Sequence, residues 1–216
     1  MMNYFNIIFS NKSVLRNLQE EKFKNLKFNG KCIEFGANDI LKKNLLKPNL
    51  EDCEIKYSNI SSKNRSFVRI DLQKKIQTKI KFDNVIIFNV IEHLPNPDFA
   101  LGNITSIIKN NGQIVGSIPF LFRIHGAPKD YSRLTKQNIK ELLKKNNFSN
   151  IKIDELGTGP FLASISLLRS YLKYLPFIYQ LLIFFAIVTD KFLNLIMNTN
   201  PKELYPIGYI FTAVKK

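Results

Sequence analysis

The run Val85-Ile86-Ile87-Phe88 is the feature that most constrains the fold of this chain. Four consecutive apolar residues do not fit a strand with one solvated face, and are typical of strands covered on both faces in a parallel sheet. Further strand signals lie at residues 31–35, 54–59, 66–70, 113–118 and 208–215, with helical stretches between several of them. This alternation predicts an open, doubly wound and mainly parallel α/β sheet.

Local signals set the limits of the expected helices. A polar helix over 14–28 fills most of a lead-in, residues 1–29. A second helix, over 97–109, is followed by Asn110-Asn111-Gly112, which is a stop signal. A third begins after Thr135, a plausible N-cap, and places Ile139, Leu142 and Leu143 on one face.

Residues 161–197 break this rhythm because they are helical and heavily apolar. The run 175–189 has no charge and is ended by Asp190 and Lys191, so it is shorter than the ~20 residues that a spanning helix needs. Two interpretations of 171–197 stay open: a helical hairpin packed on the sheet or on a second subunit, and an interfacial helix on anionic lipid. We therefore expect one domain over 30–216, with a helical insertion at about 161–200.

The composition favours a globular chain and leaves the partner open. With 45% hydrophobic residues, wholesale disorder is excluded. The 32 Lys and Arg against 17 Asp and Glu give a net charge of +15, which is compatible with nucleic acid or an anionic membrane. However, most of these residues are scattered Lys, and the joint excess of Lys, Asn, Ile and Phe is typical of an AT-rich genome. We favour the interpretation that these charges lie on solvent-exposed faces of the protein, and keep an anionic partner as the alternative.

Two cysteines, Cys32 and Cys53, make no disulfide framework, and no Cys/His spacing indicates a metal. We expect Cys32 to be a small core residue. The first residues, MMNYFNIIFSNK, lack a basic leader and a small-residue cleavage site. The expected location is the cytoplasm, and the lipid interpretation of 171–197 adds a peripheral position at the inner membrane face.

The segment Ile33-Glu34-Phe35-Gly36-Ala37-Asn38-Asp39 is the strongest local site signal. A strand that runs into a glycine turn, with an acid just before it, forms a ligand cleft at the carboxyl end of a sheet. Gly36 would let the backbone approach a ligand closely. Asn38 replaces the second glycine of the fully Gly-rich form, which is acceptable because Asn tolerates a left-handed backbone.

The order of later motifs extends this signal. Ile70-Asp71-Leu72 leaves one strand, Asn89-Val90-Ile91-Glu92-His93-Leu94 leaves another, and Asn110-Asn111-Gly112-Gln113-Ile114 enters a third. A long segment then runs from Pro119-Phe120 through His125, Asp130-Tyr131 and Arg133 to Thr135. With Tyr205-Pro206-Ile207-Gly208-Tyr209, this succession resembles class I S-adenosylmethionine-dependent methyltransferases, of the bacterial type that includes small-molecule and surface-sugar modifiers.

The resemblance covers roughly residues 30–160 and 203–215, and it implies a Rossmann-like fold with a seven-stranded sheet, helices on both faces and S-adenosyl-L-methionine as cofactor. Glu34 would hold the amino group of its methionine part, and Gly36, Ala37 and Asn38 would face its carboxylate and ribose. The remaining implied cofactor residues are Asp71 and Leu72 at the adenine, Asn89 and His93 at the fourth strand, and Asn59 where the family carries a ribose-binding acid.

An alcohol acceptor must lose a proton during methyl transfer, and a histidine or carboxylate can take it. His125 is the predicted general base, with Asp130 as its partner or substitute, and no metal is needed. Tyr131 and Arg133 are the predicted substrate residues. Purely structural roles also stay open for these residues. Asp130 and Arg133 could brace the loop, His93 could order its neighbours, and Glu92 could cap a helix or pair with another group.

We expect an enzyme that methylates a small molecule or a surface-polysaccharide precursor. Two rivals stay open. An RNA methyltransferase is suggested by the charge, although base-methylating enzymes often place a Pro-Pro pair where Asn89-Val90-Ile91-Glu92 stands. Asn38 and Asn59 suggest a catalytically silent interaction protein.

Overall fold

The computed structural model describes residues 4–24, 26–37, 52–126, 129–197 and 200–216, which form two compact units. Unit 1 comprises Met1–Phe23, Pro119–Ile124 and Asp154–Tyr209, and unit 2 comprises Lys24–Ile118, His125–Ile153 and Ile210–Lys216. Most of the predicted lead-in and nearly all of the predicted insertion therefore contribute to the same unit.

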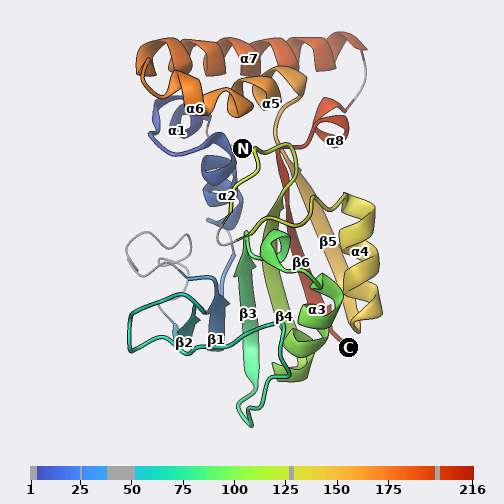
Figure 1. Ribbon diagram of the computed structural model, residues 1–216. Helices are drawn as coiled ribbons and strands as arrows, with labels where there is room; N and C mark the ends of the chain where they lie inside the picture. The colour runs from blue at the N-terminus through green and yellow to red at the C-terminus, as the bar shows by residue number, and fades with distance from the viewer. Residues whose placement is uncertain (1–3, 25, 38–51, 127–128, 198–199) are drawn as a thin grey trace. The chain divides into compact units, whose positions relative to one another are not determined.

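A six-stranded sheet has the order β2-β1-β3-β4-β6-β5. Its strands are β1 (Gly30–Phe35), β2 (Cys53–Ser58), β3 (Phe82–Phe88), β4 (Ile108–Pro119), β5 (Phe148–Leu156) and β6 (Gly208–Lys215). β1 is parallel to β2 and β3, and β3 is parallel to β4. The predicted parallel α/β sheet is confirmed (Figure 1). Val85, Ile86 and Ile87 of β3 are fully buried, as is Cys32 of β1.

β6 runs against its neighbours. The amide of Ile207 donates to the carbonyl of Leu156, and that of Lys216 donates to Asn147, so β5 and β6 pair in opposite directions. Phe120 and Leu121, just after β4, donate to Ile207 and Pro206 in the same inverted order. β6 therefore lies antiparallel between β4 and β5, and the chain passes from β5 to β6 without crossing to the opposite end of the sheet.

The described residues form six strands where seven were predicted. The predicted strand 66–70 makes only an isolated bridge between Ser58 and Val68. Side chains bind backbone amides at its start. Ser62 Oγ accepts from the amide of Asn64, and Asn64 Oδ1 accepts from the amide of Ser66, the first residue of the predicted strand. Such local turns replace a ladder. The sequence analysis also missed one strand, β5.

Two helices of unit 2 cover the sheet. α3 (Pro97–Ile107) is capped by Asn96, and α4 (Lys136–Lys145) by the hydroxyl of Thr135, which accepts from the amide of Asn138. α3 ends two residues before its predicted end because the chain enters β4 at once. Leu101 of α3 and Leu143 of α4 line one small apolar cavity together with Ile118 of β4 and Phe211 of β6. Both helices therefore pack on the same face of these strands.

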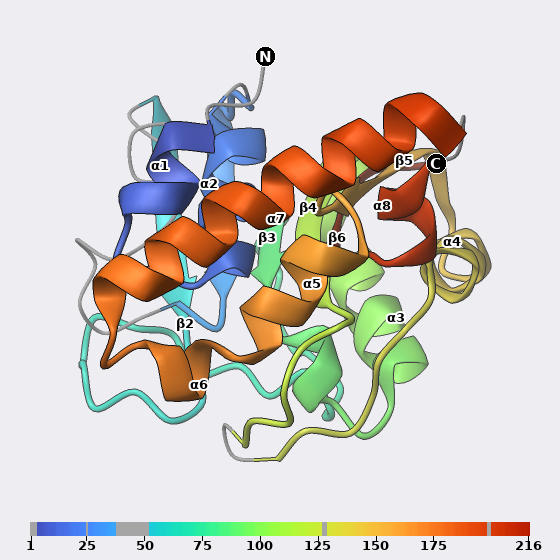
Figure 2. The same ribbon diagram turned by 90° about the horizontal axis from the view of Figure 1, so that it is seen from above.

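The helices of unit 1 are α1 (Tyr4–Phe9), α2 (Val14–Phe23), α5 (Pro160–Leu167), α6 (Arg169–Leu172), α7 (Pro176–Met197) and α8 (Pro201–Leu204). α7 runs across α1, α5 and α6 (Figure 2). One predicted end is wrong, because α2 stops at Phe23 instead of residue 28, whereas α7 continues past Asp190 and Lys191 to the predicted limit of the helical segment at residue 197. Asp190 does not end the helix because it is buried, with its charge satisfied inside unit 1.

Candidate active site

A pocket of about 670 Å³ lies in unit 2 where β1, β2 and β3 end at their carboxyl sides. This volume is in the range of small-molecule and cofactor sites. Its walls combine apolar side chains with hydroxyl, amide and carboxylate groups. The lining residues are Phe35, Gly36, Ser58, Asn59, Ile60, Ser61, Ile70, Asp71, Leu72, Gln73, Asn89, Val90, His93, Leu94, Pro95, Lys129 and Tyr131.

Six predicted cofactor residues meet in this pocket: Gly36, Asn59, Asp71, Leu72, Asn89 and His93. They come from four separate segments of the chain, so only the fold brings them together. Glu34 and Ala37 are buried beside the pocket's first segment and do not line it. Asn38 lies outside the described residues.

Gly36 has a positive φ of 70°, which disfavours any residue with a Cβ atom. A Cβ there would also collide with the side chain of Val90. The glycine is therefore required by the packing of the protein itself, whether or not a ligand approaches it. A Gly36→Val variant would disturb the fold first, so it is a poor test of ligand binding.

Asn59 braces the turn after β1. Its Nδ2 donates to the carbonyl of Ala37 at 2.9 Å, and its Oδ1 accepts from the amide of Ser61 at 2.9 Å. An aspartate could not donate to Ala37, which is a physical reason for an amide at a position where the family carries an acid. The contact of Asn59 with ribose stays a prediction.

The adenine end of the predicted site is held by its own hydrogen bonds. Asp71 Oδ1 accepts from the amide of Gln73, and the buried Asn103 donates to the carbonyls of Leu72 and Lys74. Across the pocket, Asn89 has a positive φ of 51° and donates its amide to Ser117. A strained backbone at a strand end is characteristic of binding sites, although it does not prove one.

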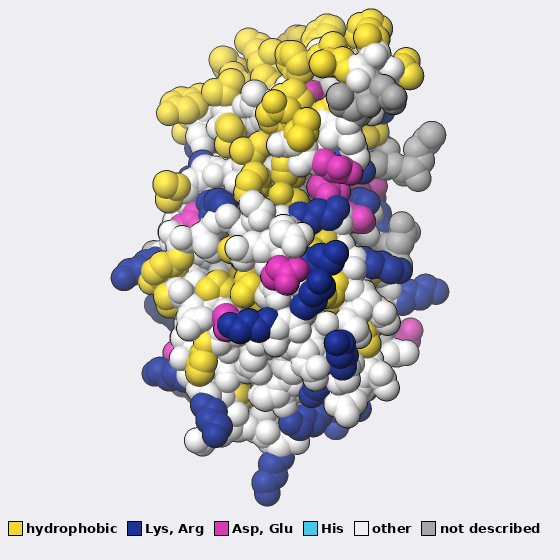
Figure 3. All heavy atoms as spheres, turned by 90° about the vertical axis from the view of Figure 1, so that its right-hand side faces the viewer, with side chains coloured by type: hydrophobic (Ala, Val, Ile, Leu, Met, Phe, Trp, Pro, Cys, Tyr) yellow, Lys and Arg dark blue, Asp and Glu magenta, His cyan; other side chains and the backbone are white. Residues whose placement is uncertain are grey.

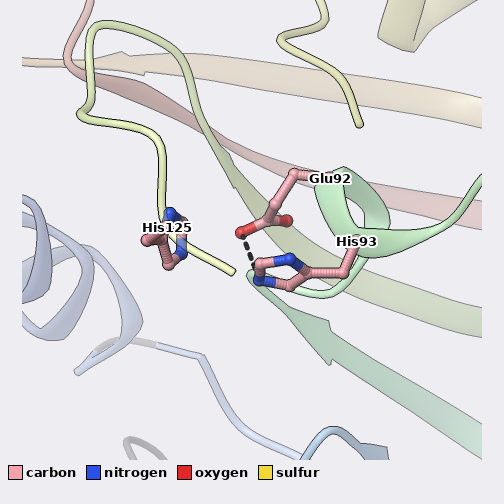
Figure 4. A group of neighbouring side chains, drawn as sticks. All are labelled: Glu92, His93 and His125. Carbon is pink, nitrogen blue, oxygen red and sulfur yellow. Dashed lines mark ion pairs between the residues drawn. The ribbon is translucent and has the colours of Figure 1, made fainter. Parts of the chain in front are cut away.

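Glu92, His93 and His125 form a cluster at the edge of this pocket (Figure 4). Glu92 and His93 belong to the short helix η3 (Ile91–His93), and His125 approaches from the loop after β4. The rings of the two histidines lie edge to face, with centroids 5.0 Å apart. His93 lines the pocket, whereas His125 is in contact with the ring of His93 and does not line the pocket.

Glu92 is the group that sequence reasoning undervalued. Its side chain is fully buried, and within the described residues neither carboxyl oxygen has a hydrogen-bond partner. Burial raises the pKa of Glu92 to about 8. An acid inside the apolar stretch Val90-Ile91-Glu92-His93-Leu94 was the only sequence signal for this position.

A hydrogen bond orients the ring of His93, and an ion-pair contact lies beside the ring of His125. His93 Nδ1 lies 2.6 Å from the carbonyl of Lys129, so this nitrogen carries the proton and Nε2 faces Glu92 Oε1 at 3.8 Å. His125 Nδ1 lies 3.3 Å from Asp130 Oδ2, and the same carboxylate accepts from the amide of His125. Asp130 thus positions the His125 ring.

Asp130 is also paired with Arg133, whose two terminal nitrogens bind its two oxygens. The hydrogen bonds from Arg133 hold the pKa of Asp130 well below its usual range. A carboxylate this acidic is a weak proton acceptor, which favours Asp130 as the partner of His125 over its use as a substitute base. Tyr131, half exposed, lines the pocket.

One carboxyl and two imidazoles with ligand atoms within 4.8 Å could also hold a divalent cation. The positive charge of Arg133 acts on Glu92 from nearby, and a bound cation would have to face it. A protonated Glu92 accounts for the cluster without a metal, because a neutral carboxyl costs less to bury.

No protein-family model and no curated protein matches the sequence. Solved structures do match. Phosphoethanolamine N-methyltransferase 2 of Haemonchus contortus, with phosphomonomethylethanolamine and S-adenosylhomocysteine, has 14% identity and a TM-score of 0.55, covering 99% of this chain and 56% of that one. This chain thus spans little more than half of that enzyme.

A SAM-dependent methyltransferase from Archaeoglobus fulgidus has 16% identity and a TM-score of 0.54, with 93% of this chain and 94% of that one covered. The [4+2]-cyclase SpnF has 13% identity and a TM-score of 0.56, with 93% and 79% covered. The fold is that of class I S-adenosylmethionine-dependent methyltransferases. Because proteins named for different reactions share it, the fold alone does not assign the chemistry.

Proposed function

We propose that this protein is an S-adenosylmethionine-dependent methyltransferase (EC 2.1.1.-) that binds its cofactor in the 670 Å³ pocket of unit 2. One observation carries the proposal: the six residues that the family resemblance selects for the cofactor line a single pocket at the carboxyl ends of parallel strands, on a fold shared with such enzymes.

The pocket residues suit this cofactor. Ile70 and Leu72 offer an apolar slot for a flat adenine ring, and Asp71 offers a carboxylate at its edge. Asn59 and Asn89 supply amide groups toward the hydroxyl-rich middle of the ligand. When bound, S-adenosylmethionine supplies an electrophilic methyl group on a sulfonium.

The protein's own contribution is alignment and proton removal. An in-line displacement gains most from holding acceptor and methyl group at the correct angle. We propose that the acceptor is a hydroxyl of a small molecule or of a surface-polysaccharide precursor. His125 takes its proton, and Asp130 fixes the ring with the proton on Nδ1, so that Nε2 is the basic atom.

The state of Arg133 bears on the acceptor. Its guanidinium is already paired with Asp130 through both terminal nitrogens. A neutral acceptor such as an uncharged sugar fits this arrangement better than an anionic one, because Arg133 then keeps its role as a brace. Tyr131, at the pocket wall, is the proposed contact for the acceptor.

Calorimetric titration with S-adenosylmethionine tests the binding half of the proposal. Ser61 is exposed and lines the pocket, so Ser61→Trp should fill the cavity and abolish measurable binding. Ser61→Ala is the matched control, and it should bind like the unmodified protein. If the unmodified protein binds no S-adenosylmethionine, the silent interaction protein becomes the better explanation.

Transfer is tested separately, with radiolabelled methyl groups offered to neutral glycans, small alcohols and RNA. Labelling of a hydroxyl acceptor supports the proposal. Labelling of RNA alone would favour the RNA methyltransferase, for which the net charge of +15 is the only observation in favour.

A further inference from the structure

The outer face of α7 is apolar and is exposed among the residues of unit 1 that the structure describes. Five residues of α7 face inward and are buried, namely Tyr179, Ile183, Ala186, Ile187 and Asp190. On the other side, Phe177, Phe185, Phe192 and Leu195 are between 59% and 82% exposed. A surface helix normally carries polar residues there, and a helix that is apolar all round belongs in a protein core or against lipid.

The apolar surface extends over the neighbouring helix. Tyr171 and Tyr174 are 78% and 75% exposed, and Leu175 is half exposed. Figure 3 shows, from one side, that hydrophobic side chains gather at the top of the molecule, where α7 lies. Tyrosines of this kind are enriched where protein meets the headgroups of a bilayer, because one end of the ring is apolar and the other is wet.

α7 is long enough to cross a membrane, with 22 residues and a mean hydropathy of 1.7, but its inner face is fixed within unit 1. The buried carboxylate of Asp190 accepts hydrogen bonds from the hydroxyl of Thr158 and from the amides of Phe161 and Leu162, at 2.6–3.0 Å. Gly159 makes this approach possible, since a Cβ there would lie 2.6 Å from Asp190 Oδ1. Crossing a membrane would break these bonds, so α7 is suited to lie along a surface.

A basic pocket of about 470 Å³ adjoins this apolar surface in unit 1. Among the residues that the structure describes, five cations and no carboxylate line it. The lining residues are Lys12, Ser13, Arg16, Phe122, Arg123, Ser166, Leu167, Arg169, Ser170 and Lys173. Glu20, which does not line the pocket, pairs with two of these cations, Lys12 and Arg16.

Residues 169–175 contribute both to the basic pocket and to the apolar surface. Arg169, Ser170 and Lys173 line the pocket, while Tyr171 and Tyr174 between and after them are exposed. The Nε of Arg169 is buried and has no hydrogen-bond partner among the described residues. Such a donor, in a pocket of hydroxyl and cationic groups, suits a phosphate oxygen.

We propose that unit 1 binds the surface of an anionic lipid bilayer, with the outer face of α7 and the two tyrosines at the headgroup–acyl boundary and a lipid phosphate in the basic pocket. Amphipathic helices bind membranes through this combination of apolar area and cationic charge. A second copy of this chain is a poorer partner for the outer face of α7. A two-fold dimer through this face would bring two equally basic pockets toward each other.

Flotation of the full chain with vesicles tests the proposal, independently of methyl transfer. We expect the protein to float with vesicles of phosphatidylglycerol and phosphatidylcholine, and to stay at the bottom with phosphatidylcholine alone. Phe185→Glu should weaken binding roughly tenfold or more, since a charge replaces an exposed phenylalanine that would enter the bilayer. Phe99→Glu, at a 45% exposed phenylalanine of α3, is the matched control and should float normally.

The basic pocket is tested with Lys173→Gln, which should weaken binding about fivefold, the usual effect of one cation at an anionic surface. Lys140→Gln on α4 removes the same charge elsewhere and should have no such effect. Absence of flotation with anionic vesicles overturns the proposal, as does flotation that neither Phe185→Glu nor Lys173→Gln weakens. A vesicle-free dimer that Phe185→Glu converts to a monomer would assign this face to a second copy.

Discussion

α4 of unit 2 and α7 of unit 1 bury their inner faces in the same way and differ in their outer faces. α4 buries Ile139 and Leu143 and presents lysines, one glutamine, one asparagine and one glutamate to solvent. α7 buries Tyr179, Ile183 and Ala186 and presents phenylalanines and leucines instead. The comparison teaches that α4 is complete once its own unit has folded, whereas α7 retains apolar area for a further partner.

The two units differ in the same sense. Unit 2 gathers polar side chains at strand ends, around a pocket suited to a small ligand. Unit 1 gathers apolar side chains and cations on its outside, suited to a broad surface. We therefore expect chemistry to depend on unit 2 and location to depend on unit 1.

The largest expected effect belongs to His125→Ala. General-base assistance is typically worth about 10²–10⁴-fold, so turnover should fall by that order with an unchanged affinity for S-adenosylmethionine. Phe185→Glu should leave turnover on a soluble acceptor unchanged. Full turnover of His125→Ala would make this histidine a loop brace and pass the base to His93.

A matched pair of Leu→Ala variants tests the two helices directly. Leu143 of α4 is fully buried, and its removal should cost about 2–5 kcal/mol of unfolding free energy. Leu195 of α7 is 82% exposed, and its removal should change stability by about 0.5 kcal/mol or less. Chemical denaturation without vesicles measures both. Equal losses would mean that the outer face of α7 is already covered in the free protein.

Glu92→Gln should change how stability depends on pH. The folded pKa, about 8, lies above the ordinary value of 4.5, so between these values the folded state holds a proton that the unfolded state has lost. Stability must then fall as pH rises from about 5 to 8. Each unit of elevation corresponds to about 1.4 kcal/mol, so we expect a loss of at least that order.

Thermal unfolding at pH 5 and pH 8 measures this effect. Glu92→Gln removes the ionisable group and should flatten the decline, with little difference from the unmodified protein at pH 5. If stability instead rises from pH 5 to 8 and a chelator reverses the rise, the Glu92, His93 and His125 cluster holds a metal ion.

Local sequence signals predicted the elements whose partners are near in the chain. Thr135 marked the start of α4 because a hydroxyl caps its own helix, and residues 208–215 showed the complete pattern of β6. β5 was missed although its burial alternates along the strand. Its outward residues Lys152 and Asp154 are charged, and its partner β6 lies more than fifty residues away.

The predicted site depended more on distant contacts. The motifs identified Gly36, Asn59, Asp71, Leu72, Asn89 and His93, and the sheet confirmed that they meet in one pocket. The structure adds a second reason for Gly36, because the side chain of Val90, far along the chain, occupies the space of its absent Cβ. The pairing of Asp130 with Arg133 was one of the interpretations left open, and the structure shows it. The contact of His93 with His125 was not predicted.

The sequence by itself determined the parallel α/β sheet, the cap of α4 and the order of the cofactor motifs, because each depends on periodicity or on residues a few positions apart. The tertiary structure alone decided the roles of two acids. Asp190 was expected only to end a run without charges, and the structure buries it inside its helix, where it binds the start of α5. The role of Glu92 as a cap or a pair was left open, and the structure buries it beside His93 and His125 with a raised pKa. A carboxyl group's role is set by the groups that surround it, and these come from segments that only folding brings together.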